Sequence, residues 1–290
     1  MPGNSHPLAE SAIGNLHLKL ETQNSTPIKS RDNSLLKLAR AVRDGKVSGL
    51  IFVEGLRLCE EALRSGLQVE AAIYSDEIAR KERAANLISK LGPACDRLVQ
   101  VSENLLATIS DTKTPQGIVV IAKRPESGKT ILEAGGDGSR LLVVMHGLNN
   151  PANVGAIMRS AEAAGANGVI TTISTADPFL PKALRGAMGS AFRLPVWNGP
   201  TLTEALTWCA EHNLQTVCTD LNAKTSYTEI DWKTPRALIV GPESIGLNPE
   251  EVSMASDAIR IPMQGEVESL NVAVAAAIVL YEAARQRGPL

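Results

Sequence analysis

The chain of 290 residues is 44% hydrophobic and 21% charged, so it can fill the core of one large globular domain or of two smaller ones. A formal net charge of −2 argues against broad, non-specific binding of nucleic acid. No apolar run approaches the roughly 18–20 residues that span a bilayer, and the sequence does not open with a secretory signal. We therefore expect a cytoplasmic protein without a membrane partner.

The first part of the chain predicts a flexible tail and then a small α/β domain. Residues 1–30 are rich in Pro, Ser, Asn and Thr and have little periodic apolar pattern, which is typical of a tail. Helical spacing of apolar residues begins at Ser34, a candidate N-cap, and stops at Gly45. Residues 31–124 then alternate between strand and helix patterns. The expected strands are 49–55, 69–75, 96–102 and 117–124. They are separated by helical patterns at 56–66 and 76–92 and by a helix and turn at 103–116.

Positive charge gathers near the start of this domain. Residues 1–130 hold 18 Lys and Arg against 15 Asp and Glu, a net +3, whereas residues 131–290 hold 11 against 16, a net −5. Within 29–46, six basic residues accompany two acidic ones. This pattern fits a solvated helix face and fits equally a surface that contacts phosphates. The basic residues that we consider are Arg31, Lys37, Arg40 and Arg43.

A linker and a second α/β series follow. Residues 125–139 lie in a stretch with four glycines and a proline, which is typical of a linker. From 140 to 290, strand and helix patterns alternate with short connections, which predicts a mostly parallel sheet covered on both faces. The expected strands are 140–148, 167–173, 192–198, 215–221, 236–241 and 258–263, and the expected helices are 154–165, 201–213, 248–256 and 270–287.

The cysteines and histidines give no sign of a metal or redox centre. The four cysteines are scattered without a C-x-x-C pair, which is typical of free thiols in a reducing compartment. The four histidines lack the spacing of a metal site, so we expect no metal.

The stretch GPESIGLNPE at 241–250 has the glycine spacing of a phosphate-binding loop but not its chemistry. Leu247 and Asn248 stand where a nucleotide-binding loop has Lys and Ser or Thr. A dinucleotide fingerprint is also absent, because no strand leads into G-x-G-x-x-G with an acid about 20 residues later. The sequence therefore excludes an ordinary Rossmann dehydrogenase.

Loops that leave the carboxyl ends of parallel strands are where such sheets bind ligands. In the loop that begins at 149, Asn150 or Asn153 can cap the next helix, which places Arg159 about two turns into it. Near the C-terminus, Ser269 is a natural N-cap for the last helix. Each feature alone is typical of an ordinary strand-to-helix connection.

Three motifs together resemble one family. They are N-x-G-x-x-x-R at 153–159, G-x-E-x-x-G at 241–246, and I-P-M-x-G…S-L-N at 261–271. In this order they resemble the SPOUT superfamily, specifically the TrmH-type (SpoU) RNA ribose 2′-O-methyltransferases, over residues 140–287. The first domain resembles the small RNA-binding domain that many of these enzymes carry.

The resemblance implies a fold and partners. It implies a deep trefoil knot in the second domain, although general topology rules disfavour knots. It also implies S-adenosylmethionine as cofactor, structured RNA as substrate, and a homodimer that packs through the helix 270–287, which is apolar on all sides.

The resemblance also assigns roles to residues. The backbone beside Gly241 would border the cofactor, and main-chain contacts would come from Ile261, Met263 and Leu270. Arg159 matches the arginine to which activation of the hydroxyl is attributed, but a guanidinium pKa above about 12 favours holding phosphate and stabilising an alkoxide over acting as a base. Glu243 is either a buried structural carboxylate or a direct site residue. The other polar site positions are Asn153, Ser269 and Asn271.

The sequence departs from the family pattern at Asn150, Ser244 and Ala187, where Asp, Gly and Ser are frequent. The last of these leaves open how the loop that carries Lys182 and Arg185, two further candidate RNA contacts, meets the RNA. Because the shortest transfer-RNA enzymes of the family lack the first domain, we expect 23S ribosomal RNA as substrate. The alternatives are a transfer-RNA methyltransferase and a non-catalytic RNA-binding or ribosome assembly factor, against which the intact motifs argue.

Overall fold

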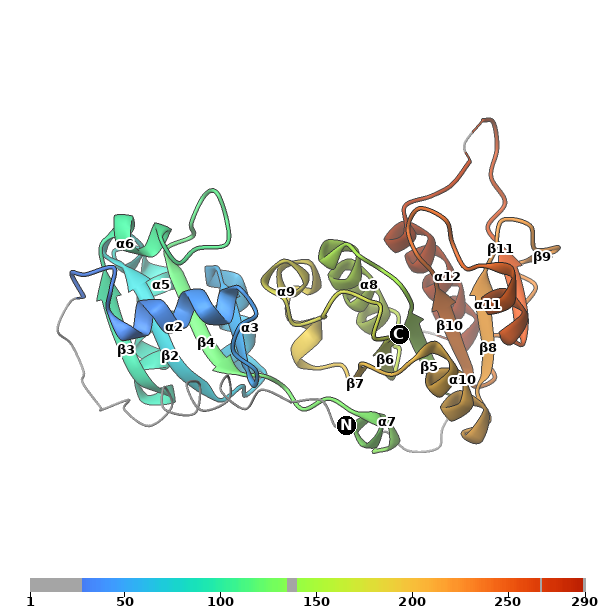
Figure 1. Cartoon of the computed structure of the whole chain (residues 1–290), viewed down its shortest axis with the longest axis horizontal. Helices are drawn as coiled ribbons and strands as arrows, with labels where there is room; N and C mark the ends of the chain where they lie inside the picture. Colours follow the sequence, from blue (N-terminus) through green and yellow to red (C-terminus); the bar gives the residue numbers. More distant parts are fainter. Residues whose placement is uncertain (1–27, 135–139, 267, 289–290) are drawn as a thin grey trace, which may run out of the picture. The chain divides into compact units, whose positions relative to one another are not determined.

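The computed structural model describes residues 28–134, 140–266 and 268–288 and divides the chain into two compact units, Met1–Arg124 and Pro125–Leu290 (Figure 1). Most of the predicted tail lies outside the described residues. Within its last three residues, Ile28 forms an isolated parallel bridge with Val101 and packs against the core of the first unit.

The first unit is a four-stranded sheet in the order β1-β4-β2-β3, in which β4 is antiparallel to both of its neighbours and β2 is parallel to β3. Its elements are α2 (Ser34–Arg43), β1 (Leu50–Glu54), α3 (Leu56–Arg64), β2 (Val69–Ser75), α4 (Asp76–Ala79), α5 (Glu82–Leu91), the 3-10 turn η1 (Gly92–Ala94), β3 (Cys95–Val101), α6 (Glu103–Ala107) and β4 (Ile118–Lys123).

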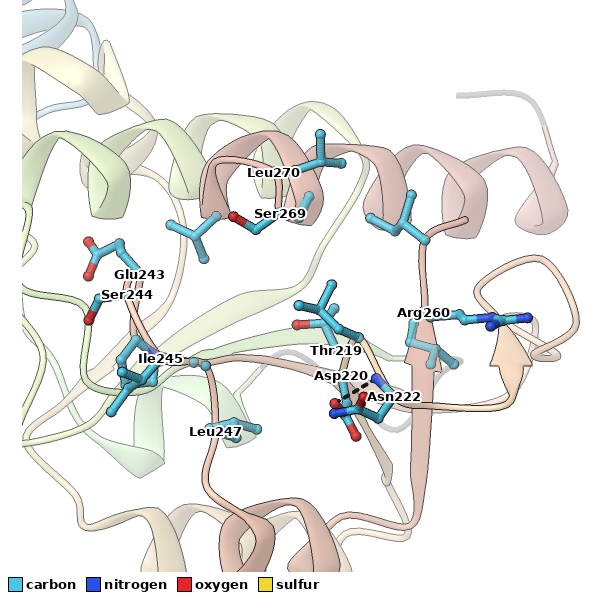
Figure 2. A pocket seen from close by; sticks show the side chains of 18 of the residues that line it. Thr219, Asp220, Asn222, Glu243, Ser244, Ile245, Leu247, Arg260, Ser269 and Leu270 are labelled. Carbon is cyan, nitrogen blue, oxygen red and sulfur yellow. Dashed lines mark hydrogen bonds between the residues drawn. The ribbon is translucent and has the colours of Figure 1, made fainter. Parts of the chain in front are cut away.

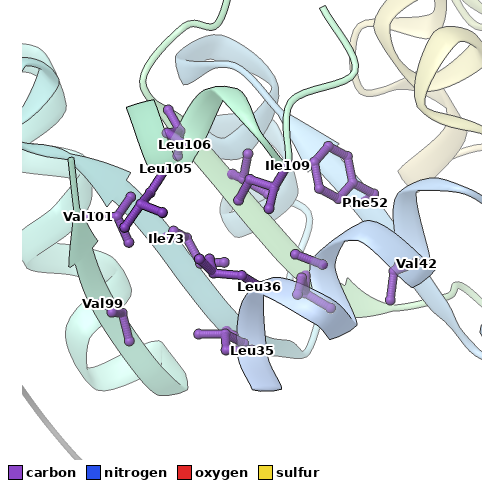
Figure 3. Close-up of a cluster of buried hydrophobic side chains, with 14 of the residues drawn as sticks. Leu35, Leu36, Val42, Phe52, Ile73, Val99, Val101, Leu105, Leu106 and Ile109 are labelled. Atoms are coloured by element: carbon purple, nitrogen blue, oxygen red, sulfur yellow. The ribbon is translucent and has the colours of Figure 1, made fainter. Parts of the chain in front are cut away.

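The core on one face of this sheet forms beneath α2 and α6 (Figure 3). Leu35, Leu36 and Val42 of α2 are buried against sheet residues such as Phe52 and Ile73. This helical spacing of apolar residues is the pattern that the sequence predicts for an amphipathic helix.

Two helix boundaries in this unit differ from the prediction. The N-cap of α2 is Asn33, not Ser34, because the Asn33 side chain accepts a hydrogen bond from the Leu35 N–H. The helix predicted over 76–92 is two helices, since Lys81 takes an extended conformation between α4 and α5.

The second unit is a seven-stranded sheet in the order β7-β6-β5-β10-β8-β11-β9, and each strand pair in it is parallel, which confirms the predicted parallel sheet. Its elements are α7 (Lys129–Glu133), β5 (Leu141–Met145), α8 (Pro151–Ala163), β6 (Gly168–Thr171), α9 (Pro181–Ala187), the 3-10 turn η2 (Ser190–Phe192), β7 (Val196–Asn198), α10 (Leu202–Glu211), β8 (Gln215–Thr219), β9 (Thr225–Ser226), β10 (Arg236–Val240), α11 (Pro249–Met254), β11 (Asp257–Arg260) and α12 (Val272–Arg287).

The segment predicted as a linker, 125–139, belongs in its described part to the second unit. Gly128 N–H donates to the Val196 carbonyl over 2.9 Å, and Leu132 of α7 is buried in the core beneath α10. Trp208 Nε1 donates to Glu133 Oε1 over 3.2 Å. The sequence did not indicate this because a five-residue helix is too short to show a period. Residues 135–139 lie outside the described part.

The strand order creates a switch point at the centre of the sheet. From β5 the chain runs outward through β6 to β7, and it then returns to build β8, β10 and β11 on the other side of β5 (Figure 1). All positions of β5 and β10 are buried, so both faces of the sheet are covered there. Ligands of open parallel sheets bind outside the carboxyl ends of the strands at such a point.

Candidate functional site

A cavity of about 300 Å³ lies at the carboxyl ends of β8, β10 and β11, beside the start of α12 (Figure 2). This volume is at the lower end of the roughly 300–1,000 Å³ of small-molecule sites. The side chains and backbone that line it come from three stretches of chain. They are Thr219 to Asn222, Gly241 to Leu247, and the residues Ile259, Arg260, Ile261, Met263, Ser269, Leu270, Val272 and Ala275.

The four residues predicted to border the cofactor all line this cavity. Gly241 comes from the loop after β10, Ile261 and Met263 follow β11, and Leu270 precedes α12. Of the residues predicted to be catalytic, Glu243 and Ser269 also line it, whereas Asn153, Asn271 and Arg159 are not among its lining residues.

The two motif glycines at 241 and 246 are required by the turn itself. A Cβ atom on Gly241 would lie 2.8 Å from Leu247 Cγ and 2.9 Å from the Leu247 nitrogen, which is closer than Cβ atoms approach backbone. Gly246 has φ +67°, a conformation that favours glycine, and its N–H donates to the Pro242 carbonyl over 3.0 Å. The glycines therefore fold a compact loop at the edge of the cavity.

The Glu243 carboxylate joins this loop to the loop after β5. Its Oε1 accepts hydrogen bonds from the Asn150 N–H (3.1 Å) and from Asn153 Nδ2 (3.2 Å), and its Oε2 accepts one from the Asn149 N–H (3.2 Å). Partial burial raises the pKa of Glu243, but the hydrogen bonds outweigh burial and hold the pKa below its usual value. Both carboxylate oxygens are therefore engaged within the protein.

Asn153 links Glu243 to the start of the last helix. Asn271 Nδ2 donates to Asn153 Oδ1 over 3.3 Å, while Asn271 Oδ1 accepts from the Ala273 N–H over 2.9 Å. Asn271 is therefore the N-cap of α12, and the predicted cap at Ser269 is wrong because Ser269 lies two residues before this cap. At the other helix, Asn150 and not Asn153 is the N-cap of α8.

Arg159 lies on α8 with an exposed side chain that forms no hydrogen bond or ion pair to any residue of the described ranges. One turn earlier, α8 crosses α9 closely, because a Cβ on Gly155 would lie 2.1 Å from the Ala183 carbonyl oxygen. The motif glycine thus serves helix packing. On α9, Lys182 is exposed and Arg185 is half-buried.

The basic residues predicted to contact RNA in the first unit divide into two kinds. Arg31 and Lys37 are exposed, and Lys37 forms an exposed ion pair with Asp32 at 3.4 Å. Arg40 and Arg43 instead donate within the unit: Arg40 to the Arg31 carbonyl, and Arg43 to the carbonyls of Thr108 and Ser110.

Sequence reasoning missed several lining residues after β8 and β11. Thr219 ends β8, Asp220 and Asn222 follow it, and Arg260 ends β11. The signal was present, since polar residues after a buried parallel strand mark the ligand edge of such a sheet.

The far end of the 241–248 loop is anchored by a second polar group. Glu251 Oε2 accepts from the Asn248 N–H over 2.9 Å, and Glu251 Oε1 lies 3.2 Å from His146 Nε2. His146 Nδ1 lies 3.0 Å from the hydroxyl of the buried Thr172. Both ends of the loop are therefore tied to the segment that follows β5.

The described ranges show neither a metal-binding cluster nor a membrane-spanning helix. Across the described ranges, His, Cys, Asp and Glu side chains do not gather into a group of three that could hold a metal ion. Within the same ranges, each helix is too short or too polar to cross a membrane.

The fold and the cavity define an α/β protein with a small-molecule site at the switch point of a parallel sheet. Residues 140–281 match the SpoU rRNA Methylase family, and residues 34–120 match the MRM3-like substrate binding domain. The chain belongs to the SpoU rRNA methylase family.

Several proteins are similar to this chain over most of its length. It is 33% identical to the 23S rRNA (guanosine(2553)-2'-O)-methyltransferase RlmP of Bacillus subtilis (strain 168), over 79% of this chain and 86% of that protein. It is 29% identical to the 23S rRNA (uridine(2479)-2'-O)-methyltransferase of Streptomyces viridochromogenes, over 83% and 84%. The crystal structure of an AdoMet-bound rRNA methyltransferase from Sinorhizobium meliloti matches with a TM-score of 0.78 and 30% identity, over 90% of this chain and 97% of that one.

Proposed function

We propose that this protein transfers a methyl group from S-adenosylmethionine to a ribose 2′-hydroxyl of 23S ribosomal RNA. The observation that carries the proposal is the chain of hydrogen bonds from Asn271 through Asn153 to Glu243, at the edge of the cavity. It joins one residue from each of the three motifs that the sequence shares with the family.

The lining of the cavity suits S-adenosylmethionine in charge and polarity. When bound, this cofactor supplies an electrophilic methyl group on a positively charged sulfonium. Two carboxylates, Asp220 and Glu243, line the cavity against one guanidinium, Arg260, which suits a ligand with net positive charge. Leu247 and Leu270 add apolar walls, and the backbone of the 241–248 loop offers donors and acceptors to a neutral nucleoside.

The remaining task of the protein is to place the ribose hydroxyl, because a positioned nucleophile and in-line geometry account for much of such a reaction. We assign Asn153, Ser269 and Asn271 to orienting the ribose or the methionine end of the cofactor. Glu243 holds Asn153 in place, with both of its own oxygens occupied. Arg159, exposed outside the cavity, binds the target phosphate and stabilises the developing alkoxide.

Ribosomal RNA is favoured as the substrate over transfer RNA because residues 34–120 match a substrate binding domain and because similar proteins that cover both units are named for 23S rRNA. A non-catalytic RNA-binding or assembly factor is the alternative. It is disfavoured because the motif side chains are present and Asn153, Glu243 and Asn271 contact one another.

Three further properties belong to this proposal. A homodimer is supported by the exposed side chains of Val274 and Tyr281 on α12. A trefoil knot is supported by the match of residues 140–281 to the SpoU rRNA Methylase family, since the resemblance to that family implies the knot. A cytoplasmic location is supported by the buried free thiols of Cys59, Cys209 and Cys218.

Methyl transfer from labelled S-adenosylmethionine by the purified full-length protein tests the function directly. We expect label to enter 23S rRNA at one nucleotide whose 3′ phosphodiester becomes resistant to alkali, as ribose methylation requires. Transfer RNA in the same assay should remain unlabelled. Label in transfer RNA alone would show that the protein is a transfer-RNA methyltransferase. Tight RNA binding without any methyl transfer would favour the non-catalytic RNA-binding or assembly factor.

A further inference from the structure

The two carboxylates that line the cavity differ in whether an oxygen remains without a hydrogen-bond partner and can accept a bond from a ligand. The Glu243 oxygens already accept three hydrogen bonds from the loop after β5. Asp220 follows β8, and Figure 2 shows it and Glu243 on different sides of the cavity. Asp220 Oδ1 accepts one hydrogen bond, from the Asn222 N–H at 3.0 Å, and among the described residues Oδ2 has no hydrogen-bond partner.

The backbone holds this carboxylate in place. Asp220 N–H donates to the Ile259 carbonyl over 2.9 Å, which ties the residue to β11, and the Ala223 N–H donates to the Asp220 carbonyl. The bond from Asn222 to Oδ1 closes a turn that fixes the side chain. A fixed carboxylate loses little freedom when it accepts a further hydrogen bond.

An ionised carboxylate accepts hydrogen bonds and donates none, so its natural ligand partner is a group with hydroxyl donors. The cofactor of the proposed function offers one such group, the pair of neighbouring hydroxyls on its ribose. An acid placed after a parallel strand takes a ribose hydroxyl in dinucleotide-binding folds too, for the same geometric reason.

We propose that Asp220 binds the ribose hydroxyls of the adenosine part of the cofactor and makes this cavity selective for ribonucleosides over deoxyribonucleosides. The inference rests on the proposed function, since it takes S-adenosylmethionine as the occupant of the cavity. It assigns Asp220 a binding role, distinct from the orienting role of Asn153 and from that of Glu243, which holds Asn153 in place.

The test combines a protein variant with a ligand variant. Asp220→Asn keeps an oxygen that can accept from the Asn222 N–H, but it removes the charge and gives the ribose an amide donor in place of an acceptor. The ligand is 5′-methylthioadenosine, which is uncharged, and its 2′-deoxy and 2′,3′-dideoxy forms. Calorimetry on the full-length protein measures each Kd, and Asp96→Asn, an exposed carboxylate in the first unit, is the matched control.

We expect Asp220→Asn to weaken 5′-methylthioadenosine roughly 10–100-fold, as loss of hydrogen bonds to a charged group does, and to change the dideoxy form less than about 2-fold. Wild-type protein should itself bind the dideoxy form roughly 10-fold or more weakly. Equal loss for all three ligands would overturn the inference, because Asp220 would then act on the loop and not on the ribose.

Two further comparisons separate the alternatives. If Asp220 only attracts positive charge, Asp220→Asn would weaken S-adenosylmethionine far more than its neutral-sulfur product S-adenosylhomocysteine, and the inference would fail. If Asp220→Asn does not fold, wild-type protein that binds the ribose and dideoxy ligands equally well still refutes it. Wild-type protein that binds neither S-adenosylmethionine nor 5′-methylthioadenosine would refute the proposed function as well.

Discussion

The side-chain amide of Asn153 donates a hydrogen bond to Glu243 Oε1 over 3.2 Å, although the two residues are 90 positions apart in the chain. Asn271, which lies 118 positions after Asn153, donates a hydrogen bond to the Asn153 side chain. Three loops that leave the sheet at separate places are therefore held by one asparagine. Of the three residues, Glu243 also lines the cavity, so these contacts reach its edge.

Replacing Glu243 by Gln should loosen the loop that borders the cavity. A glutamine side chain cannot accept three hydrogen bonds with both terminal atoms, since one of them is a donor. We expect S-adenosylmethionine to bind roughly 2–10-fold more weakly, from the net value of about one hydrogen bond. Calorimetry measures the affinity, and Glu211→Gln, an exposed carboxylate at the end of α10, is the control. An unchanged affinity of the Glu243→Gln protein for S-adenosylmethionine would show that the hydrogen bonds of Glu243 do not hold the loop in its binding conformation.

The same carboxylate gives a pH signature. The pKa of Glu243 is lower in the folded protein than its usual value of 4.5, so its ionised form favours the folded state. This contribution is complete above pH 4.5 and is lost as pH falls through the lower folded pKa. The difference in the free energy of unfolding between wild type and Glu243→Gln, measured by denaturant unfolding, should therefore stay constant from about pH 8 to about pH 5 and shrink at more acid pH. A difference that instead grows as the pH falls would contradict a lowered pKa of Glu243 in the folded protein.

Replacing Gly155 by Ala should destabilise the second unit. The added Cβ would lie 2.1 Å from the Ala183 carbonyl oxygen and 2.8 Å from the Ala187 nitrogen, so α8 and α9 must move apart. Overpacking of this kind costs about 1–3 kcal/mol, which scanning calorimetry would record as a lower Tm. Gly92→Ala is the control, because its Cβ would meet only Leu98 Cδ2 at 3.7 Å. Equal Tm values for the two variants would refute the close crossing.

Arg159→Ala should separate chemistry from cofactor binding. Arg159 does not line the cavity, so the Kd of S-adenosylmethionine should change less than about 2-fold. Single-turnover methyl transfer should fall about 10²–10³-fold, as it does when one donor to a developing oxyanion is removed. Arg159→Lys should restore little, because an ammonium lacks the planar fork of donors. Arg80→Ala, an exposed arginine of the first unit, is the control. Normal transfer by Arg159→Ala would move the catalytic assignment to Ser269, Asn271 or Glu243.

Lys37 and Arg43 should respond differently to neutralisation. The Lys37 side chain is 58% exposed, so Lys37→Gln should weaken RNA binding and reduce the salt slope by about one, without a loss of stability. Arg43 donates to the carbonyls of Thr108 and Ser110, so Arg43→Gln should lower the free energy of unfolding by about 1–2 kcal/mol. Filter binding at several salt concentrations and thermal unfolding measure the two effects. If Arg43→Gln leaves the stability unchanged and weakens RNA binding, Arg43 is an RNA contact and not a structural residue.

A charge on the exposed face of α12 should break the proposed dimer. Val274 and Tyr281, 49% and 51% exposed, are seven positions apart and so lie on one face of the helix. Val274→Glu should convert the dimer into monomers at micromolar concentration in sedimentation. Met254→Glu, at an apolar residue that is 42% exposed on α11, should leave the dimer intact. A wild-type protein that sediments as a monomer would overturn the assembly.

The sequence by itself determined the class of each unit and the edge of the sheet that carries the site. Buried parallel strands have continuous apolar sequences, as do β5 and β10, which is why their positions could be predicted, although β5 ends three residues before its predicted end. The position of Gly241 after such a run marked the ligand loop. The sequence did not predict the short helix α7 or the break in the helix at Lys81, because a periodic pattern needs more residues than these features contain.

Only the tertiary structure decided what the polar residues do. A sequence cannot show that Asn153 lies between Glu243 and Asn271, because hydrogen bonds between distant segments depend on strand order and not on spacing. The same holds for the divided basic cluster, in which Arg43 is bound to its own unit and Lys37 is exposed. Residue type limits which bonds a side chain can form, and the packing of the sheet selects the partners that it meets.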